Sequence, residues 1–291
     1  MAMVIISFAL TLVLTKVAIS VMAKKGLVDK DLHKEKEVEV PNVGGIAIVF
    51  GFSVVLVAAY VLEGAFAYLL ALLVFLAAAS VGMLDDIHAF KPAQKLIFGC
   101  LAAVPLLMVV PWQVFPVVLL FAGMSVVSNW TNMLAGFNGM EIGVGAIALL
   151  FMAMHALSGE VSFVLLAYFA ALLAFLFFNK YPAKIFPGDV GTFPIGAMLV
   201  FGWVFGVPLM ILAILLIPHL LDALLKLFTA GVMSRQRFLP TNVENGLLIV
   251  PKESYLSLSR AILRIRPMQE WQLVAVVWLF EAALGIVTLL I

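Results

Sequence analysis

Long apolar runs separated by short polar connections dominate the sequence. Ten runs cover residues 2–23, 43–62, 65–84, 94–110, 116–133, 143–158, 161–179, 192–206, 208–230 and 270–291. An α-helix of about 20 residues is long enough to cross the hydrocarbon core of a bilayer. The pattern therefore predicts an all-α, polytopic membrane protein with about ten transmembrane helices.

The polar connections between these runs fall into two classes that alternate along the chain. One class comprises residues 24–42, 85–93, 135–142, 180–191 and 231–269, and the other comprises 63–64, 111–115, 159–160 and a turn near Gly206. All 17 Lys and Arg residues lie in the first class or within one or two turns of it. Because cytoplasmic loops carry the excess of Lys and Arg, we expect the first class in the cytoplasm and both termini outside.

The composition agrees with a membrane protein and excludes several other classes. Of 291 residues, 65% are hydrophobic and 11% are charged, whereas soluble domains carry about 25% charged residues. The net charge of +1 gives no basic surface for nucleic acid. We find no internal repeat, low-complexity tract or linker, so we expect one membrane-embedded domain over residues 1–291. The predicted location is therefore an integral membrane one, in the cell membrane if the source is prokaryotic or archaeal, with the Lys- and Arg-rich connections in the cytoplasm.

Two adjacent carboxylates leave the end of the third apolar run. Asp85 and Asp86 are followed by Lys91 and Lys95. Adjacent carboxylates repel each other, so a cation is expected nearby, and either a metal ion or Lys95 could supply it. The alternative is an ordinary solvated helix end, where Asp is common.

Polar side chains also cluster at the end of the fifth run. Asn129 and Asn132 are three residues apart and share a helix face. Amides at the end of an apolar helix are costly unless they are used, either for function or for hydrogen bonds between helices. Asn138-Gly139 is a strong turn signal.

Two further cytoplasmic connections carry candidate chemistry. Asp189 lies in a segment whose prolines and glycines oppose a regular helix, near Lys180 and Lys184. An oxygen donor in such a turn suits Mg²⁺, which takes few protein carboxylates together with substrate phosphates. Arg235 and Arg237 lie in the longest cytoplasmic loop, either as phosphate-binding groups or as simple topology charges.

Carboxylates, amides and cations at one membrane face are what phosphoryl transfer to a lipid requires. A transporter or lipid flippase would instead place polar residues across the bilayer, and a catalytically inactive scaffold would not need all of these groups. Asp222 lies four residues before Lys226, which is most simply a structural ion pair.

The motifs around Asp85–Lys95, Asn129–Glu141 and Asn179–Asp189 resemble those of the polyprenyl-phosphate N-acetylhexosamine-1-phosphate transferases. The nearest branch in this resemblance makes N-acetylglucosaminyl-diphospho-dolichol, the first step of lipid-linked oligosaccharide assembly for N-glycosylation. The resemblance implies transfer of N-acetylglucosamine-1-phosphate from UDP-N-acetylglucosamine to a polyprenyl phosphate, with release of UMP. It also implies a membrane enzyme that depends on Mg²⁺, with Mn²⁺ as a substitute, and a possible homodimer.

The same resemblance assigns roles to individual residues. It implies catalytic roles for Asp85, Asp86 and Lys95, metal ligation by Asn132 and Asp189, and substrate contacts by Asn129, Asn138, Glu141, Lys184, Arg235 and Arg237. Among these, Asn138 is expected to recognise uracil, and the two arginines to contact the diphosphate and the sugar. An alternative within the class is a transferase that uses another UDP-N-acetylhexosamine for a cell-wall or surface polymer.

Overall fold

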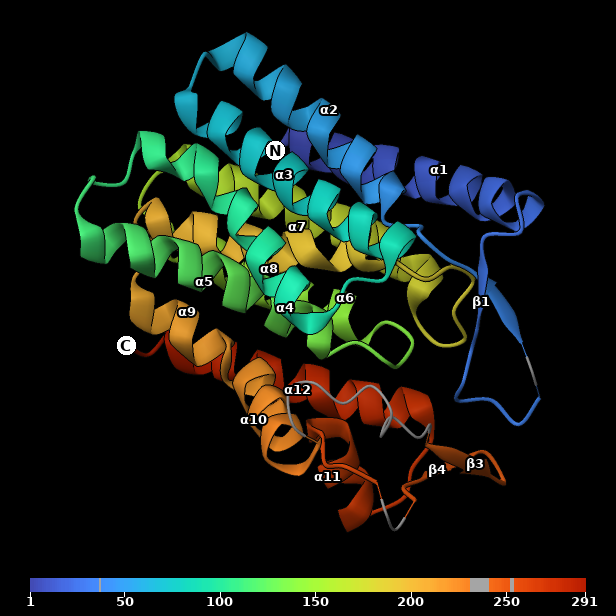
Figure 1. Ribbon diagram of the computed structural model, residues 1–291. Helices are drawn as coiled ribbons and strands as arrows, with labels where there is room; N and C mark the ends of the chain where they lie inside the picture. Colours follow the sequence, from blue (N-terminus) through green and yellow to red (C-terminus); the bar gives the residue numbers. More distant parts are fainter. Residues whose placement is uncertain (37, 231–240, 252–253) are drawn as a thin grey trace.

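The structure is a computed structural model that describes residues 1–36, 38–230, 241–251 and 254–291, and it is built mainly of α-helices (Figure 1). Six helices are long and apolar enough to cross a membrane: α1 (Ala2–Lys24), α2 (Ile46–Glu63), α3 (Phe66–His88), α5 (Val114–Met133), α7 (Gly159–Asn179) and α12 (Glu270–Thr288). The shorter elements are α4 (Pro92–Gly99), the 3₁₀-helix η1 (Cys100–Met108), α6 (Met140–Met154), α8 (Asp189–Val204), α9 (Leu209–Leu215), α10 (Ile217–Ala230) and α11 (Leu258–Ile265).

Each of the ten predicted apolar runs coincides with a helix or with two consecutive helices. By length and composition, six of the described helices qualify as membrane spans, and α9 with α10 makes a seventh if the pair is one span. The helical membrane architecture is therefore confirmed, whereas the number ten and the sidedness of the termini stay predictions.

Two of the predicted continuous helices are broken in the structure. α9 and α10 meet at an angle of 57°, and Pro218 follows directly on the break. Proline lacks the amide N–H that would bond to the preceding turn, which favours a bend there. The run over 94–110 changes from α4 to the 3₁₀-helix η1, which contains Pro105.

Two short antiparallel hairpins depart from the all-α prediction. β1 (Val28–Lys30) pairs with β2 (Glu39–Pro41), and β3 (Asn242–Glu244) pairs with β4 (Leu247–Ile249). Strands of three residues are too short for an alternating pattern to be recognised in the sequence. Both hairpins lie at one end of the helical bundle (Figure 1).

α8 lies in the centre of the bundle, with 13 of its 16 residues buried. It packs on α3 and α5, and α3 comes close to it at Gly82, where a Cβ would lie 2.2 Å from the carbonyl oxygen of Asp189. Only glycine permits two backbones this close together. The first residue of α8 is thereby held directly against the C-terminal part of α3.

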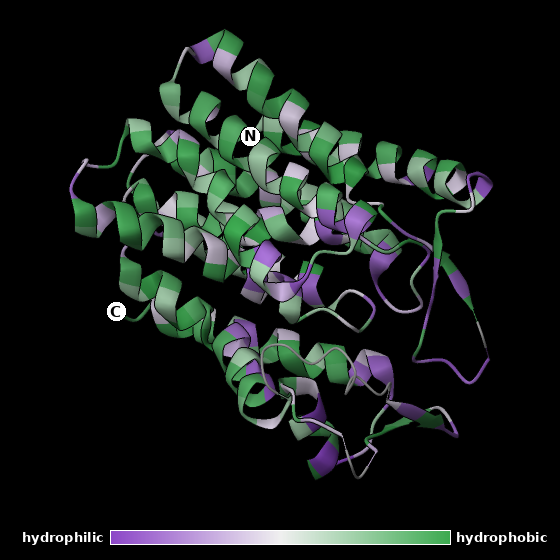
Figure 2. Ribbon diagram, in the orientation of Figure 1, coloured by the Kyte–Doolittle hydropathy of each residue, from purple (hydrophilic) through white to green (hydrophobic). Residues whose placement is uncertain are grey.

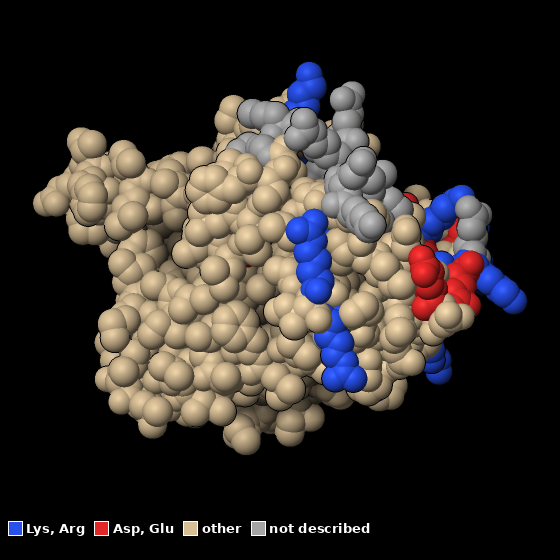
Figure 3. Space-filling model, turned by 90° about the horizontal axis from the view of Figure 1, so that it is seen from below, with Lys and Arg blue, Asp and Glu red and all other residues tan. Residues whose placement is uncertain are grey.

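Hydrophilic residues gather at the end of the bundle that carries the hairpins (Figure 2). The ends of α1, α3 and α7 and the starts of α6 and α12 meet there (Figure 1). In the view from below, charged side chains lie over the half of the molecule near the hairpins, and the opposite part of that face carries none (Figure 3). The polar groups of widely separated segments therefore share one end of the molecule.

Candidate active site

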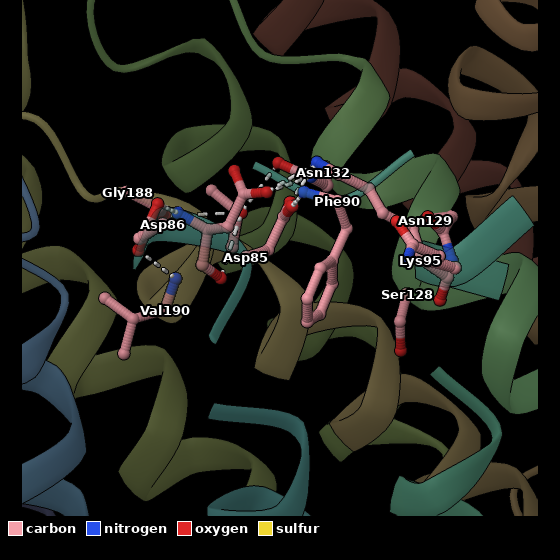
Figure 4. Close-up of polar contacts among 12 residues, drawn as sticks. Asp85, Asp86, Phe90, Lys95, Ser128, Asn129, Asn132, Gly188 and Val190 are labelled. Carbon is pink, nitrogen blue, oxygen red and sulfur yellow. Dashed lines mark hydrogen bonds and ion pairs between the residues drawn. The ribbon is translucent and has the colours of Figure 1, made fainter. Parts of the chain in front are cut away.

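The turn before α8 places Asp189 at the first position of that helix. Gly188 adopts φ +65 and ψ 173, a backbone conformation that is essentially restricted to glycine. Both oxygens of the Asp86 carboxylate accept hydrogen bonds from the start of α8: Oδ1 from the N–H of Asp189 at 2.8 Å and Oδ2 from the N–H of Val190 at 3.0 Å (Figure 4). The first N–H groups of a helix have no partner within the helix, so Asp86 caps α8 from α3.

A second set of contacts fixes the same turn against the chain before α2. The N–H of Phe186 donates to the carbonyl of Pro41 at 2.7 Å, and the N–H of Gly44 donates to the carbonyl of Phe186 at 2.9 Å. The N–H of Gly45 donates to the carbonyl of Pro187 at 2.8 Å. The segment that carries Asp189 is thus held from two sides.

Lys95 joins two carboxylates from different helices. Its ammonium lies 2.7 Å from Oδ2 of Asp189 and forms an ion pair with Oδ2 of Asp85. Asp85 is buried, and its other oxygen accepts a hydrogen bond from the N–H of Phe90 at 2.6 Å. The prediction that a cation would balance the Asp85–Asp86 pair is confirmed, because Lys95 supplies one.

Asn132 of α5 also contacts Asp189. We call these five residues the Asp189 cluster: Asp85, Asp86, Lys95, Asn132 and Asp189. The Nδ2 of Asn132 donates to Oδ2 of Asp189 at 3.1 Å, and its Oδ1 accepts from the hydroxyl of Thr192 at 2.9 Å. Residues up to 104 positions apart therefore meet at the start of α8.

A cavity of about 600 Å³ opens beside the Asp189 cluster. Asn132, Asp189 and Thr192 form part of its lining, together with Glu141, Asn179 and residues 186–188. The rest of the lining comes from residues 29–33, Asn42 and 135–138. A cavity of this volume is within the range of small-molecule sites, and several charged and amide groups line it.

Several of these lining residues were not predicted from the sequence. Asp29, Asp31, His33 and Asn42 all belong to the first predicted cytoplasmic connection. The ring of His33 stacks on Phe137 with 4.4 Å between the ring centres, and burial lowers the pKa of His33 to about 4. The imidazole is therefore neutral at pH 7. The density of charged residues in this connection was the available signal.

Asn138 lies in the predicted turn before α6 and is almost fully buried. Its Oδ1 accepts a hydrogen bond from the N–H of Ala183 at 2.9 Å, and its Nδ2 donates to Oδ2 of Asp31 at 3.2 Å. Glu141, one turn further on, is buried at the cavity, and among the described residues its Oε2 has no hydrogen-bond partner.

The remaining predicted substrate contacts lie elsewhere. The amide of Asn129 donates to the carbonyl of Ser125 at 2.8 Å and to that of Lys95 at 3.5 Å, so it links α5 to α4. Lys184 is exposed and outside the cavity lining. Arg235 and Arg237 lie outside the described residues. The structural ion pair predicted for Asp222 and Lys226 is confirmed, at 2.7 Å.

The Asp189 cluster has a donor set that fits a divalent cation. The cluster holds three carboxylates and a single ammonium, that of Lys95, so negative charge exceeds positive charge when all three carboxylates are ionised. No group of three His, Cys, Asp or Glu side chains arranged for a metal occurs among the described residues. Mg²⁺ does not require one, since it is commonly held by one or two carboxylates, with water and substrate phosphates as its other ligands. Asp189 and the amide oxygen of Asn132 are suitable protein ligands at the cavity.

Comparison with known proteins agrees with this arrangement of residues. The family model described as glycosyl transferase family 4 matches residues 66–207, which include the whole Asp189 cluster. A protein of Methanocaldococcus jannaschii named as a glycosyltransferase is 36% identical, over 90% of this chain and 86% of its own length. The chain belongs to glycosyl transferase family 4. Within it, the predicted membership of the polyprenyl-phosphate N-acetylhexosamine-1-phosphate transferases is confirmed.

Other relatives in this family carry more specific names. A Sulfolobus acidocaldarius protein named as a UDP-N-acetylglucosamine–dolichyl-phosphate N-acetylglucosaminephosphotransferase is 30% identical, over 97% of this chain and 93% of its own. A Bacillus subtilis protein named as an undecaprenyl-phosphate N-acetylglucosaminyl 1-phosphate transferase is 27% identical, over 66% of this chain and 59% of its own. Family membership and the apolar helices together identify an integral membrane glycosyl-1-phosphate transferase.

Proposed function

We propose that this family member transfers N-acetylglucosamine-1-phosphate from UDP-N-acetylglucosamine to a dolichyl-type polyprenyl phosphate on the cytoplasmic side of the membrane. The products are a lipid-linked diphospho-sugar and UMP, which makes this the first step of lipid-linked oligosaccharide assembly for N-glycosylation. The observation that carries the proposal is the Asp189 cluster at a polar cavity. It is supported by the similarity, over almost the whole of both chains, to the Sulfolobus acidocaldarius protein named for this reaction.

The reaction joins two phosphates that are both negatively charged. An oxygen of the lipid phosphate attacks the β-phosphorus of the UDP-sugar, and the bond from that phosphorus to the oxygen of UMP breaks. A phosphate monoester is largely ionised at pH 7, so the attacking oxygen needs little proton removal. We therefore assign Asp85 and Asp86 to electrostatic and positioning roles.

Charge neutralisation is the main requirement of such a transfer. We assign Asp189 and Asn132 as ligands of Mg²⁺, for which Mn²⁺ can substitute, and the bound ion supplies the positive charge that offsets the two phosphates. The Lys95 ammonium and the Asn132 amide both contact Oδ2 of Asp189. From this position the ammonium can also donate to a substrate phosphate.

The acceptor requires an apolar surface as well as a phosphate site. An apolar groove of about 220 Å³ runs between α5, α8, α9 and α10, and its lining includes Trp130, Trp203 and Leu212. This groove is beside α5, the helix that carries Asn132. An isoprenoid chain fits such a surface by its chemistry, because no polar partner is needed along it.

The donor and the acceptor can be identified with purified protein in lipid nanodiscs. We expect UMP release with UDP-N-acetylglucosamine and dolichyl phosphate, and much less release when UDP-N-acetylgalactosamine or UDP-glucose replaces the donor. A preference for another UDP-N-acetylhexosamine, or for undecaprenyl phosphate alone, would favour the surface-polymer alternative. Transbilayer movement of lipid without UMP release would support a lipid transporter instead.

A further inference from the structure

A second charged cluster includes two residues of the cavity lining, Asp31 and Asn138, and two residues outside that lining, Lys34 and Glu270. Its centre is Lys34, whose ammonium lies 2.5 Å from Oε2 of Glu270, 3.0 Å from Oδ2 of Asp31 and 3.5 Å from Oδ1 of Asn138. The same ammonium lies 4.5 Å from the centre of the Tyr181 ring. Four segments far apart in the sequence therefore meet at one lysine.

Glu270 uses both carboxylate oxygens in this cluster. One oxygen pairs with Lys34, and the other accepts a hydrogen bond from the backbone N–H of Asn138 at 2.7 Å. The Asn138 side chain is bonded on its two sides by Asp31 and by the N–H of Ala183. The position and the rotation of the Asn138 amide are thus both set by residues outside its own loop.

These groups are well shielded from solvent. The side chains of Asp31 and Glu270 are each 3% exposed, and that of Lys34 is 15% exposed. Burial by itself lowers the pKa of Lys34, but hydrogen bonds and charges from Glu270 and Asp31 outweigh it and raise the pKa, so the ammonium stays charged. A shielded and charged contact is stronger than an exposed surface pair.

The location of this cluster favours the water-soluble substrate. Residues 29–33 and 135–138 form part of the cavity lining, and they are connections or a short strand rather than apolar helices. A polyprenyl chain requires apolar surface, which lies instead in the groove along α5 and α8. The donor nucleotide is therefore expected at the part of the cavity lining that contains Asn138.

We propose that Lys34 and Glu270 form a latch that positions Asn138 for the uridine nucleotide of the donor. Both are positioning residues, since they act through Asn138 and its loop, and Glu270 links the start of α12 to that loop. This inference rests on the proposed function and adds to it two residues from opposite ends of the chain. A neighbouring contact also holds the segment that carries Lys34: Glu35 accepts a hydrogen bond from the N–H of Gly246 at 2.8 Å, in the turn of the β3–β4 hairpin.

Steady-state kinetics of four variants in nanodiscs test the latch. Lys34→Met removes the charge and keeps much of the length, and Glu270→Gln keeps an oxygen for the N–H of Asn138. We expect each to raise the KM for UDP-N-acetylglucosamine about tenfold, the size of one lost charge-assisted contact. The kcat should change by less than about threefold, and the KM for dolichyl phosphate should not change. Lys34→Arg should restore most of the donor affinity, and Lys36→Met, at an exposed lysine on the same segment, should match wild type.

The double variant Lys34→Met/Glu270→Gln separates a latch from two independent contacts. Because the two residues act as one unit, its donor KM should be no higher than that of the worse single variant. Additive losses, an unchanged donor KM in both single variants, or an equal rise in the KM of dolichyl phosphate would overturn the proposal. If Lys34→Met does not fold, the donor KM of the single variants Glu270→Gln and Lys34→Arg is compared instead: the first should be raised and the second close to wild type.

Binding of UMP distinguishes failure of the latch from failure of the proposed function. Calorimetry on the same nanodiscs should show about tenfold weaker UMP binding by Lys34→Met and Glu270→Gln than by wild type. A wild-type protein that is inert with UDP-sugars would refute the proposed function, and the UMP affinities would still decide the latch. Equal UMP affinities for wild type and both variants, with an active wild type, would refute the latch alone.

Discussion

The ammonium of Lys95 lies 2.7 Å from the Asp189 carboxylate and also pairs with Asp85, so one lysine joins the ends of α3, α4 and α8. Without it, two carboxylates would face each other in a partly buried site. The lysine therefore serves stability in the free protein and charge neutralisation when two phosphates are bound. This double use gives the first prediction.

Lys95→Met should lower both stability and turnover. We expect the free energy of unfolding to fall by about 1.5–3 kcal/mol, the usual size of a hydrogen bond to a charged group. The kcat should fall by roughly a hundredfold or more, because an electrostatic group at the reacting phosphate is lost. Thermal unfolding in detergent and UMP release measure the two effects. Lys25→Met, at an exposed lysine after α1, is the matched control, and a Lys95→Met enzyme with normal kcat would contradict this role.

Asp86 should act mainly as a helix cap. Asp86→Ala leaves the N–H groups of Asp189 and Val190 without their acceptor, so we expect a loss of about 0.5–2 kcal/mol in the free energy of unfolding. Asp86→Asn keeps one acceptor and should lose less. The kcat should fall together with stability, because Asp189 is no longer fixed. Glu39→Gln, at an exposed position, is the control for stability. If Asp86→Ala is as stable as wild type and this control but has lost its activity, Asp86 acts directly in the reaction and its capping role is unimportant.

Metal removal tests the assignment of Asp189 and Asn132. EDTA should abolish UMP release, and addition of Mg²⁺ or Mn²⁺ should restore it. Asp189→Asn removes a charge that the cation requires, so we expect kcat to fall by about two to three orders of magnitude. Asn132→Ala should raise the Mg²⁺ concentration needed for half-maximal activity. Full turnover in EDTA would show that Lys95 alone neutralises the phosphates.

Much of the Asp189 cluster was predictable from the sequence, because each member lies within one turn of the end of an apolar run. Such positions gather at one membrane face whatever the order of the helices. The latch was not predictable in this way. Lys34 and Glu270 are 236 positions apart, and nothing in a lone lysine or a Glu before a helix indicates its partner. Their contact depends on how the connections fold over the end of the bundle.

The same reasoning explains where the predicted helices were incomplete. The apolar pattern located each run, but it does not show a break within a run. At the break between α9 and α10, the residues on both sides are apolar apart from Pro218 and His219. The segment over residues 28–41 was predicted only as part of a polar connection. It forms a hairpin by backbone pairing, which leaves little trace in the pattern of side chains, and residues 29–33 contribute to the cavity lining.

Orientation in the membrane is open to direct labelling. In a Cys100→Ser background, we expect an impermeant thiol reagent added to whole cells to label Gln113→Cys and to spare Val38→Cys, because the Lys and Arg residues surround the connection that contains position 38. Both positions are exposed. Labelling after permeabilisation is the control for reactivity. Labelling of position 38 and not of 113 in intact cells would place the Asp189 cluster outside.

The most direct test of the proposed transfer follows the β-phosphate of the donor. UDP-N-acetylglucosamine labelled with ³²P at the β-phosphorus is given to the purified wild-type protein with dolichyl phosphate and Mg²⁺. If the sugar-1-phosphate is transferred, the label appears in the extractable lipid product and the released UMP is unlabelled, and Asp189→Asn forms almost none of either. Label that remains in the water phase as UDP, while sugar enters the lipid, would contradict the proposed reaction.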